Sequence, residues 1–337
     1  MKMNKKLVAM AVAAAVAVPM AAQAAGSANV SGFADVRYTV TDDPNKPSTG
    51  KHPTEGKFTA VGEVDFVGGQ GPVTARVDAD VMLDPSGGGN SVTLEQIFFA
   101  WAINEQVNLL GGVFNNPIGL EEEDTTDLDT INHGQIFNIL DGQTALYGNN
   151  IAGVAVAGKL GMVDVTVGLL NDLAQTNEEN SFALVLGGSP VQNLNVEVGY
   201  VTQASAGTSA NANTAENVFD INATYGLMEN ASVFVEFLGA GKVVDSAYAV
   251  GGKVAFTDAF EAALRYDNVS YDVSSRKDTS TVTVAGTWKA ADNLRIRAEF
   301  QSKDDPNNSG GNSDAVARSI SGGDGTLFQV QFLADLP

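Results

Sequence analysis

The sequence predicts an all-β fold, a transmembrane antiparallel β-barrel of about 16 strands with short turns at one end and long loops at the other. Three observations predict it. Apolar and polar residues alternate along most of the chain, which is the period of a strand with one apolar face. The alternating segments are roughly ten residues long, the length of a tilted strand that crosses a bilayer. The connections between them are alternately tight and long, as in barrels of this kind.

The first residues are typical of a secretory signal peptide. Lys2, Lys5 and Lys6 precede the apolar run LVAMAVAAAVAVPMAA, and Ala22–Ala24 supplies the small residues of a cleavage site. The run is too short and too rich in alanine to favour a membrane-spanning helix, although an uncleaved anchor is the alternative. We expect residues 1–24 to be removed on export and residues 25–337 to form one barrel domain.

The strands follow from the alternation. In the first, Val30, Val36 and Val40 share one face, and Asp35 and Arg37 lie on the other. The segments near residues 91, 106 and 180 alternate less cleanly. We expect strands to begin near residues 29, 57, 72, 91, 106, 151, 162, 180, 193, 216, 230, 246, 259, 279, 292 and 326.

The connections set the topology. Tight links such as GGQG, MEN and AADN alternate with long polar ones such as TDDPNKPSTGKHPTEG and TQASAGTSANANTAEN. If each strand pairs with the next, the short turns lie at the periplasmic end and the long loops at the external end. Closure is required in lipid, where every backbone amide needs a partner. A soluble β-sandwich is the alternative, but so many strands would need two domains, and no linker divides the chain.

Composition excludes several other classes of protein. The chain has no cysteine and only 2 histidines, so disulfides and thiolate metal sites are unavailable to it. Without residues 1–24, 16 basic side chains remain against 40 acidic ones, a formal charge of −24. This charge disfavours a nucleic-acid partner or a broad basic surface for anionic lipids.

The polar face of such a barrel surrounds a lumen wide enough for water. By strand parity, five arginines point inward from the first, third, thirteenth and fifteenth strands, which share one arc of the wall when the last strand closes on the first. This basic arc consists of Arg37, Arg76, Arg265, Arg295 and Arg297.

The longest connection, from about residue 115 to residue 150, concentrates acidic residues. Pro117 and Gly119 give it a defined turn at its start. Apolar residues such as Ile131, Ile136 and Leu140 indicate that it packs against something, and the inner wall is the available surface. We therefore expect it to fold inward. Its acidic residues are Glu121, Glu122, Glu123, Asp124, Asp127 and Asp129.

A signal peptide, sixteen alternating strands and a long acidic third external loop resemble the general porins of Gram-negative outer membranes. The element FNNPIGLEEE after a strand resembles the OmpL-like β-barrel porins, although the PEFGG loop motif of enterobacterial porins is absent. The resemblance implies an outer-membrane porin, commonly a homotrimer embedded in outer-membrane lipids. It also implies that the six loop acids form a pore constriction facing the basic arc of the pore wall.

The excess of acids on the inward face favours cations, so we expect a cation-preferring channel for passive diffusion of ions and small hydrophilic solutes. A plugged structural or adhesion barrel is the alternative, and an outer-membrane barrel enzyme using His52 or His133 is another. We expect no catalytic residue and no cofactor. Calcium could bind the acidic stretches LEEEDTTDLD and DDPNNSGGNSD through oxygen ligands, although neither has EF-hand spacing.

Overall fold

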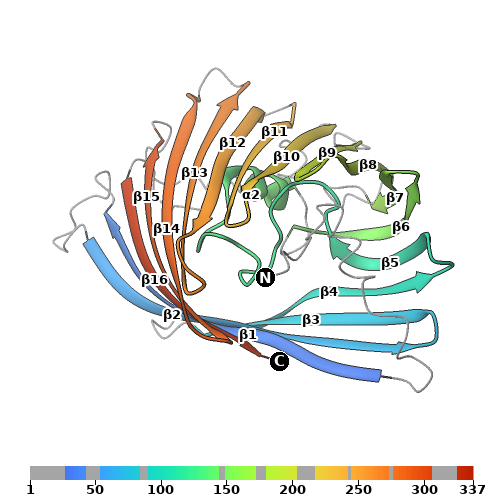
Figure 1. Cartoon of the computed structure of the whole chain (residues 1–337), viewed down its shortest axis with the longest axis horizontal. Helices are drawn as coiled ribbons and strands as arrows, with labels where there is room; N and C mark the ends of the chain where they lie inside the picture. The colour runs from blue at the N-terminus through green and yellow to red at the C-terminus, as the bar shows by residue number, and fades with distance from the viewer. Residues whose placement is uncertain are drawn as a thin grey trace.

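The computed structural model describes residues 27–42, 54–83, 90–143, 149–171, 180–202, 217–241, 244–272, 276–305 and 325–336. The expected signal segment, residues 1–24, lies outside these ranges, as does His52. The described residues form one closed antiparallel sheet (Figure 1). Its strands are β1 (Ser27–Asp42), β2 (Thr54–Gln70), β3 (Val73–Leu83), β4 (Ser91–Ala102), β5 (Val107–Asn115), β6 (Asn150–Leu160), β7 (Val163–Asn171), β8 (Asn180–Val191), β9 (Leu194–Val201), β10 (Val218–Met228), β11 (Ala231–Gly239), β12 (Val244–Ala255), β13 (Phe260–Tyr271), β14 (Thr279–Ala291), β15 (Leu294–Asp304) and β16 (Gly325–Leu336).

The strand order confirms the predicted barrel. Each strand pairs with the next, and β16 closes on β1 with Arg37 opposite Gln331. The connections at one end of the barrel have two to four residues, and those at the other end are longer except for the four-residue connection between β11 and β12. The third long connection, between β5 and β6, is the longest.

The outer face of the barrel is apolar, as the alternation predicts. Val36, Val284 and Phe300 point outward and are 40%, 46% and 45% exposed. Their strand neighbours Asp35, Thr283 and Glu299 point inward and are almost fully buried. No helix among the described residues is long and apolar enough to cross a membrane.

The inner face is not polar all round, which the alternation did not predict. One stretch of the wall buries apolar side chains inside the barrel, among them Leu110 and Phe114 of β5 and Val185 of β8. Strands with apolar residues on both faces lose the alternating pattern, which explains the weak signals near residues 106 and 180. The weak signal near residue 91 has another cause, because a register shift in β4 turns the consecutive residues Glu95 and Gln96 inward.

The long connection between β5 and β6 folds into the barrel, as expected, and it contains a helix that the sequence analysis did not expect. Helix α2 (Gln135–Gln143) lies inside the barrel and packs against β12 and β13 (Figure 1). Ile136, Ile139 and Leu140, spaced three and four residues apart, share one helix face and join the internal apolar cluster. The hydrophobic effect therefore holds the helix against the inner wall.

Candidate pore constriction

The inward connection begins with the turn that Pro117 and Gly119 were expected to form. Gly119 has a φ of 105°, a conformation that other residues rarely adopt. Ile118 then fits against Gly199 of β9, where an added Cβ would lie 2.3 Å from Ile118 Cγ2. Leu120, which follows Gly119, donates its backbone N–H to Glu236 of β11 at 2.7 Å. The turn is thus fixed by one apolar contact and one hydrogen bond.

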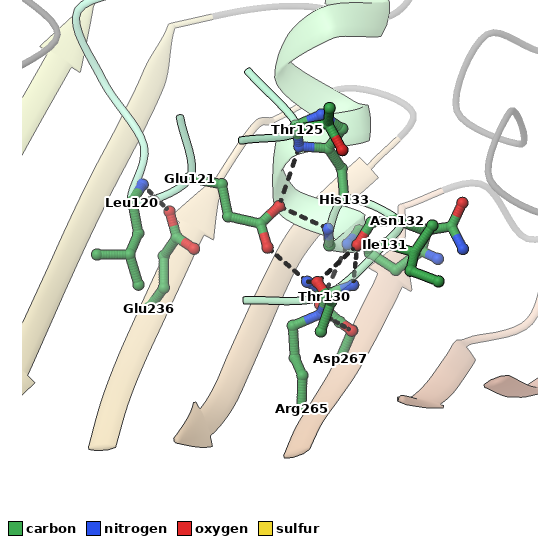
Figure 2. Close-up of polar contacts among 12 residues, drawn as sticks. Leu120, Glu121, Thr125, Thr130, Ile131, Asn132, His133, Glu236, Arg265 and Asp267 are labelled. Atoms are coloured by element: carbon green, nitrogen blue, oxygen red, sulfur yellow. Dashed lines mark hydrogen bonds and ion pairs between the residues drawn. The ribbon is translucent and has the colours of Figure 1, made fainter. Parts of the chain in front are cut away.

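Glu121 forms the central anchor between the connection and the wall (Figure 2). Its carboxylate lies 2.5 Å from Arg265 Nη1, and Arg265 Nε donates to Asp267 at 3.0 Å. The same two carboxylates accept backbone N–H groups at the start of α2, from Gly134 to Glu121 at 2.6 Å and from Gln135 to Asp267 at 3.1 Å. Acids at a helix N-terminus satisfy its free N–H groups and complement its dipole.

Arg265 also binds the connection itself. Its guanidinium donates to Thr130 Oγ1 at 3.1 Å and to the Asn132 carbonyl at 3.0 Å, and the side chain is almost fully buried. Burial raises the pKa of Glu121, but the charge of Arg265 and hydrogen bonds from His133 and Gly134 outweigh it and lower the pKa to about 2. Glu121 is therefore a buried anion at neutral pH.

Two more arginines of the basic arc hold backbone carbonyls of the connection. Arg297, 1% exposed, donates to the carbonyls of Thr125 at 2.9 Å and Leu128 at 2.7 Å. Arg295 donates to the carbonyl of Thr126 at 2.5 Å. On the same wall, Glu299 accepts the Ile131 N–H at 2.5 Å. The segment between residues 125 and 131 therefore lies directly on β15.

The other two arginines lie against strand carboxylates. Arg37 pairs with Asp35 at 2.6 Å. Arg76 pairs with Asp78 at 2.6 Å and reaches Asp124 of the connection at 3.8 Å. Burial raises the pKa of Asp124 to about 6, because the charge of Arg76 only partly offsets burial and neighbouring acids.

The remaining loop acids border open space. Asp129 pairs with Lys253 at 2.6 Å, and both side chains are nearly half exposed. A cavity of about 260 Å³ separates the connection from the wall formed by β7 to β13. Burial, together with the charges of Glu95, Asp141, Asp124 and Asp80, raises the pKa of Glu123 well above its ordinary value. The carboxylates that line this cavity are Glu121, Glu122, Glu123, Asp127, Asp129, Asp164 and Glu197.

The structure brings the basic arc and the loop acids together in a way that differs from the sequence expectation. The resemblance implied two sets of charges that face each other across a gap. Glu121 contacts Arg265 directly, and the cavity of about 260 Å³ that both line lies toward β7 to β13. A second cavity, of about 880 Å³, has Asp124, Asp127 and Arg295 in its lining. The physical reason for the direct contact is burial, since a guanidinium under a packed loop needs direct partners.

Sequence reasoning missed most of the residues that fix the connection. Strand parity places Glu236, Asp267 and Glu299 on the inward face, but nothing in the sequence marks them as acceptors for the loop backbone. Gln329 and Gln331 of β16 also contact Asn132 and Thr125. The one available signal was the helical spacing of Ile136, Ile139 and Leu140, which could have identified α2.

His133, the histidine considered for catalysis, lies within this anchor (Figure 2). Its ring stacks on Phe137 with centroids 3.7 Å apart, and its Nδ1 lies 3.4 Å from Glu121. The stacking on Phe137 and the contact with the Glu121 carboxylate hold the His133 ring in place within the loop.

Known structures share this fold at low sequence identity. An anion-selective porin from Comamonas acidovorans superposes with a TM-score of 0.69 and 10% identity over 92% of this chain and 100% of that one. A porin of Rhodopseudomonas blastica gives a TM-score of 0.60 with 14% identity, over 92% and 100%. OmpT, an outer membrane protein of Vibrio cholerae, gives 0.62 with 14% identity, over 92% and 97%. No protein-family model and no curated protein sequence matches the chain.

Proposed function

We propose that this protein is a porin of the bacterial outer membrane, a non-enzymatic channel through which ions and small hydrophilic solutes diffuse passively. A closed barrel with an apolar exterior fits a bilayer, because lipid requires every backbone amide to be paired. The fold that the protein shares with solved porins also supports the proposal of an outer-membrane channel. The inward connection fills part of the lumen and leaves a cavity of about 260 Å³ between itself and β7 to β13, which we take as the passage.

The passage is cation-preferring. Seven carboxylates and two cationic side chains, Lys253 and Arg265, line its cavity. Arg265 is already held by Glu121 and Asp267, and Lys253 by Asp129. The local field is therefore negative even if Glu123 carries a proton. Charges at a constriction determine which ions enter, because low-dielectric walls weaken screening. This acidic lining is the observation that carries the proposal.

The test is the reversal potential of the purified protein in a planar bilayer under a KCl gradient. We expect the sign of cation preference, with a magnitude that falls at high salt, since the Debye length shrinks from about 10 Å at 0.1 M to about 3 Å at 1 M. The double variant Glu122→Gln and Asp127→Asn should shift the potential toward anions.

A matched control removes two exposed charges away from the passage, Glu105 in the β4–β5 turn and Asp245 on β12. Glu105→Gln with Asp245→Asn should leave the reversal potential unchanged. A wild-type potential with the sign of anion preference would contradict the proposal.

A plugged structural or adhesion barrel is the second candidate. The packing of α2 in the internal apolar cluster favours it, because a helix held this way fills part of the lumen. Absence of single-channel conductance in folded, bilayer-inserted protein would favour this candidate over the porin.

Three further expectations belong to the porin proposal. The signal segment would direct export to the outer membrane, where the barrel contacts lipid. The protein would assemble as a homotrimer, which the mass of the detergent-solubilised complex would test. An enzymatic role through His133 would require esterase or lipase activity that disappears in His133→Ala.

A further inference from the structure

The cavity beside the inward connection is lined by apolar as well as acidic side chains. Val185 of β8, Phe137 of α2 and Phe234 of β11 line it together with the carboxylates. A hydrated inorganic ion gains nothing from apolar surface, because the hydrophobic effect acts only on apolar atoms. Pockets that bind organic ligands, in contrast, combine apolar side chains with a few polar groups. The lining therefore fits a solute that carries apolar atoms.

The ring of Phe234 is held in place against β12. Gly251 is directly opposite Phe234 in the register of β11 and β12. A Cβ added to Gly251 would lie 2.6 Å from Phe234 Cε1, so the absence of a side chain at this position leaves room for the ring. The close contact fixes an aromatic surface inside the barrel. Aromatic faces bind apolar atoms and also attract cations.

Glu197 of β9 supplies a negative charge in the same cavity. Its side chain lines the cavity and is 3% exposed. Asn222 of β10, which is neutral, donates a hydrogen bond to it, and no basic side chain in the described part of the chain pairs with it. Burying a carboxylate without a cationic partner is costly. A positively charged ligand would supply that partner.

A second, independent observation points to a ligand that donates hydrogen bonds. Three side-chain atoms of this lining are buried without a hydrogen-bond partner among the described residues, and all three are oxygens: Asn115 Oδ1, Asn116 Oδ1 and Glu123 Oε2. Asn116 is 6% exposed, and its amide nitrogen already donates to Asn149 at 3.3 Å. Buried acceptors without donors cost free energy. An ammonium group offers three donors and no acceptor.

The dimensions of the cavity limit the size of the ligand. Its volume of about 260 Å³ is slightly below the range of about 300–1,000 Å³ that is usual for drug-sized ligands. One strand, β10, separates the strands of Glu197 and Phe234, so these strands are about 10 Å apart. A single ring with a short aminoalkyl chain would reach from one side chain to the other.

We propose that this cavity binds small organic ammonium ions with an apolar body, the ammonium group at Glu197 and the body against Phe234. The proposal rests on the proposed function in taking the cavity as the passage, and it names the class of solute that the passage favours. An inorganic cation such as Ca²⁺ would meet the charge but gain nothing from the apolar surface. Of the two acidic stretches expected to bind calcium, most of DDPNNSGGNSD lies outside the described residues.

The experiment is isothermal titration calorimetry of the folded, full-length protein in detergent at low ionic strength, with the heat from protein-free micelles subtracted. The probe is 2-phenylethylammonium, for which we expect saturable binding of one ion per chain. Methylammonium keeps the charge without the ring, and 2-phenylethanol keeps the ring without the charge. Each should bind at least about tenfold more weakly, because each loses one of the two interactions.

Three variants locate the site. Glu197→Gln should weaken binding of 2-phenylethylammonium by about tenfold or more, because a hydrogen bond to a charged group is lost. Phe234→Leu should weaken it roughly threefold, since the aliphatic side chain keeps apolar surface but loses the cation–π attraction. Glu63→Gln is the matched control and should bind like the wild type, because Glu63 of β2 is also 3% exposed but does not line the cavity.

Three outcomes would overturn the proposal. They are the absence of saturable binding at millimolar concentrations, equal affinities for 2-phenylethylammonium and methylammonium, and an equal loss in Glu63→Gln and Glu197→Gln. The comparison of the three compounds uses wild-type protein, so it remains decisive if Glu197→Gln folds poorly.

Conductance in a planar bilayer separates this proposal from the proposed function. A cation-preferring current in protein that does not bind 2-phenylethylammonium would refute the ammonium site and leave the porin. Saturable, Glu197-dependent binding in protein that conducts no ions would support the site and contradict the porin.

Discussion

Replacing Glu121 with glutamine should release the inward connection from the wall. Glu121→Gln keeps the shape of the side chain but removes the charge that pairs with Arg265 at 2.5 Å and accepts the Gly134 N–H at 2.6 Å. The Arg265 guanidinium would stay buried beside Asp267 with one partner fewer. Breaking a buried pair by removing one member typically costs about 3–5 kcal/mol.

The pKa of Glu121 gives an independent magnitude. A fall from its ordinary value of 4.5 to about 2 corresponds to about 3 kcal/mol of stabilisation by the charged form. The side chain is 17% exposed, so solvent screening is limited. Because the folded pKa lies below the unfolded one, this stabilisation is complete above pH 4.5 and is lost as the pH falls toward 2.

The assay is amide hydrogen exchange of α2 in detergent micelles. The opening free energy of the helix should fall by about 3 kcal/mol in Glu121→Gln, so exchange should accelerate about a hundredfold at neutral pH. The wild-type opening free energy should fall between pH 4.5 and pH 2, whereas that of the variant should not. The double variant Glu121→Gln and Arg265→Met should cost less than the sum of its single variants.

Asp129→Asn supplies the control, because it removes an acid from the same connection. Its partner Lys253 is 47% exposed, and exposed pairs contribute less than about 1 kcal/mol. Equal acceleration of exchange in Asp129→Asn and Glu121→Gln would refute the buried anchor. So would a Glu121→Gln variant that retains the wild-type pH dependence.

Three further predictions concern the outer face, the turn and the pH. Val284→Arg places a charge on the apolar exterior at mid-strand and should destabilise the bilayer-inserted barrel by about 2–4 kcal/mol, whereas Ser232→Arg, which faces the lumen, should cost much less in urea titrations. Gly199→Val would displace Ile118 and loosen the turn, so protease should cleave the connection faster than in wild type, while Gly286→Ala, which has open space, should not change cleavage. Burial and neighbouring acids raise the pKa of Glu123, which lines the passage, well above its ordinary value, so it loses its charge at a higher pH than an ordinary glutamate; cation preference should weaken as the pH falls, and a pH-independent reversal potential would contradict this.

The barrel could be read from the chain because each strand carries its own signal. Val284 alternates with Thr283 in the sequence, and the same alternation separates the outer face from the inner one in the structure. The first residues predicted for the strands agree closely with those observed, and the predicted first residue of β14, Thr279, is the observed one. The signal failed where the lumen is filled. Leu110 and Phe114 are apolar because they belong to the internal apolar cluster that α2 joins, and no local pattern records that cluster.

For the candidate site too, the sequence predicted some features and only the structure showed the others. Parity alone put Arg37, Arg265 and Arg297 on the inner wall, and composition alone marked the acidic connection. Parity gives only the direction of a side chain, so it could not reveal that Arg297 binds loop carbonyls. Nor could it place Glu95, because one extra residue in a bulge reverses the faces that follow.

The sequence by itself determined the barrel, its closure, the exterior and the existence of a long acidic inward connection, because a period of two and the lengths of turns are local properties. Only the tertiary structure decided against which arc of the wall that connection packs. The connection lies against one arc of the wall for two reasons. Helix α2 packs against β12 and β13, and Arg265 and Arg297 donate hydrogen bonds to carbonyls of the connection. Contacts between residues more than a hundred positions apart depend on the closed barrel, so they appear only when every strand is in place.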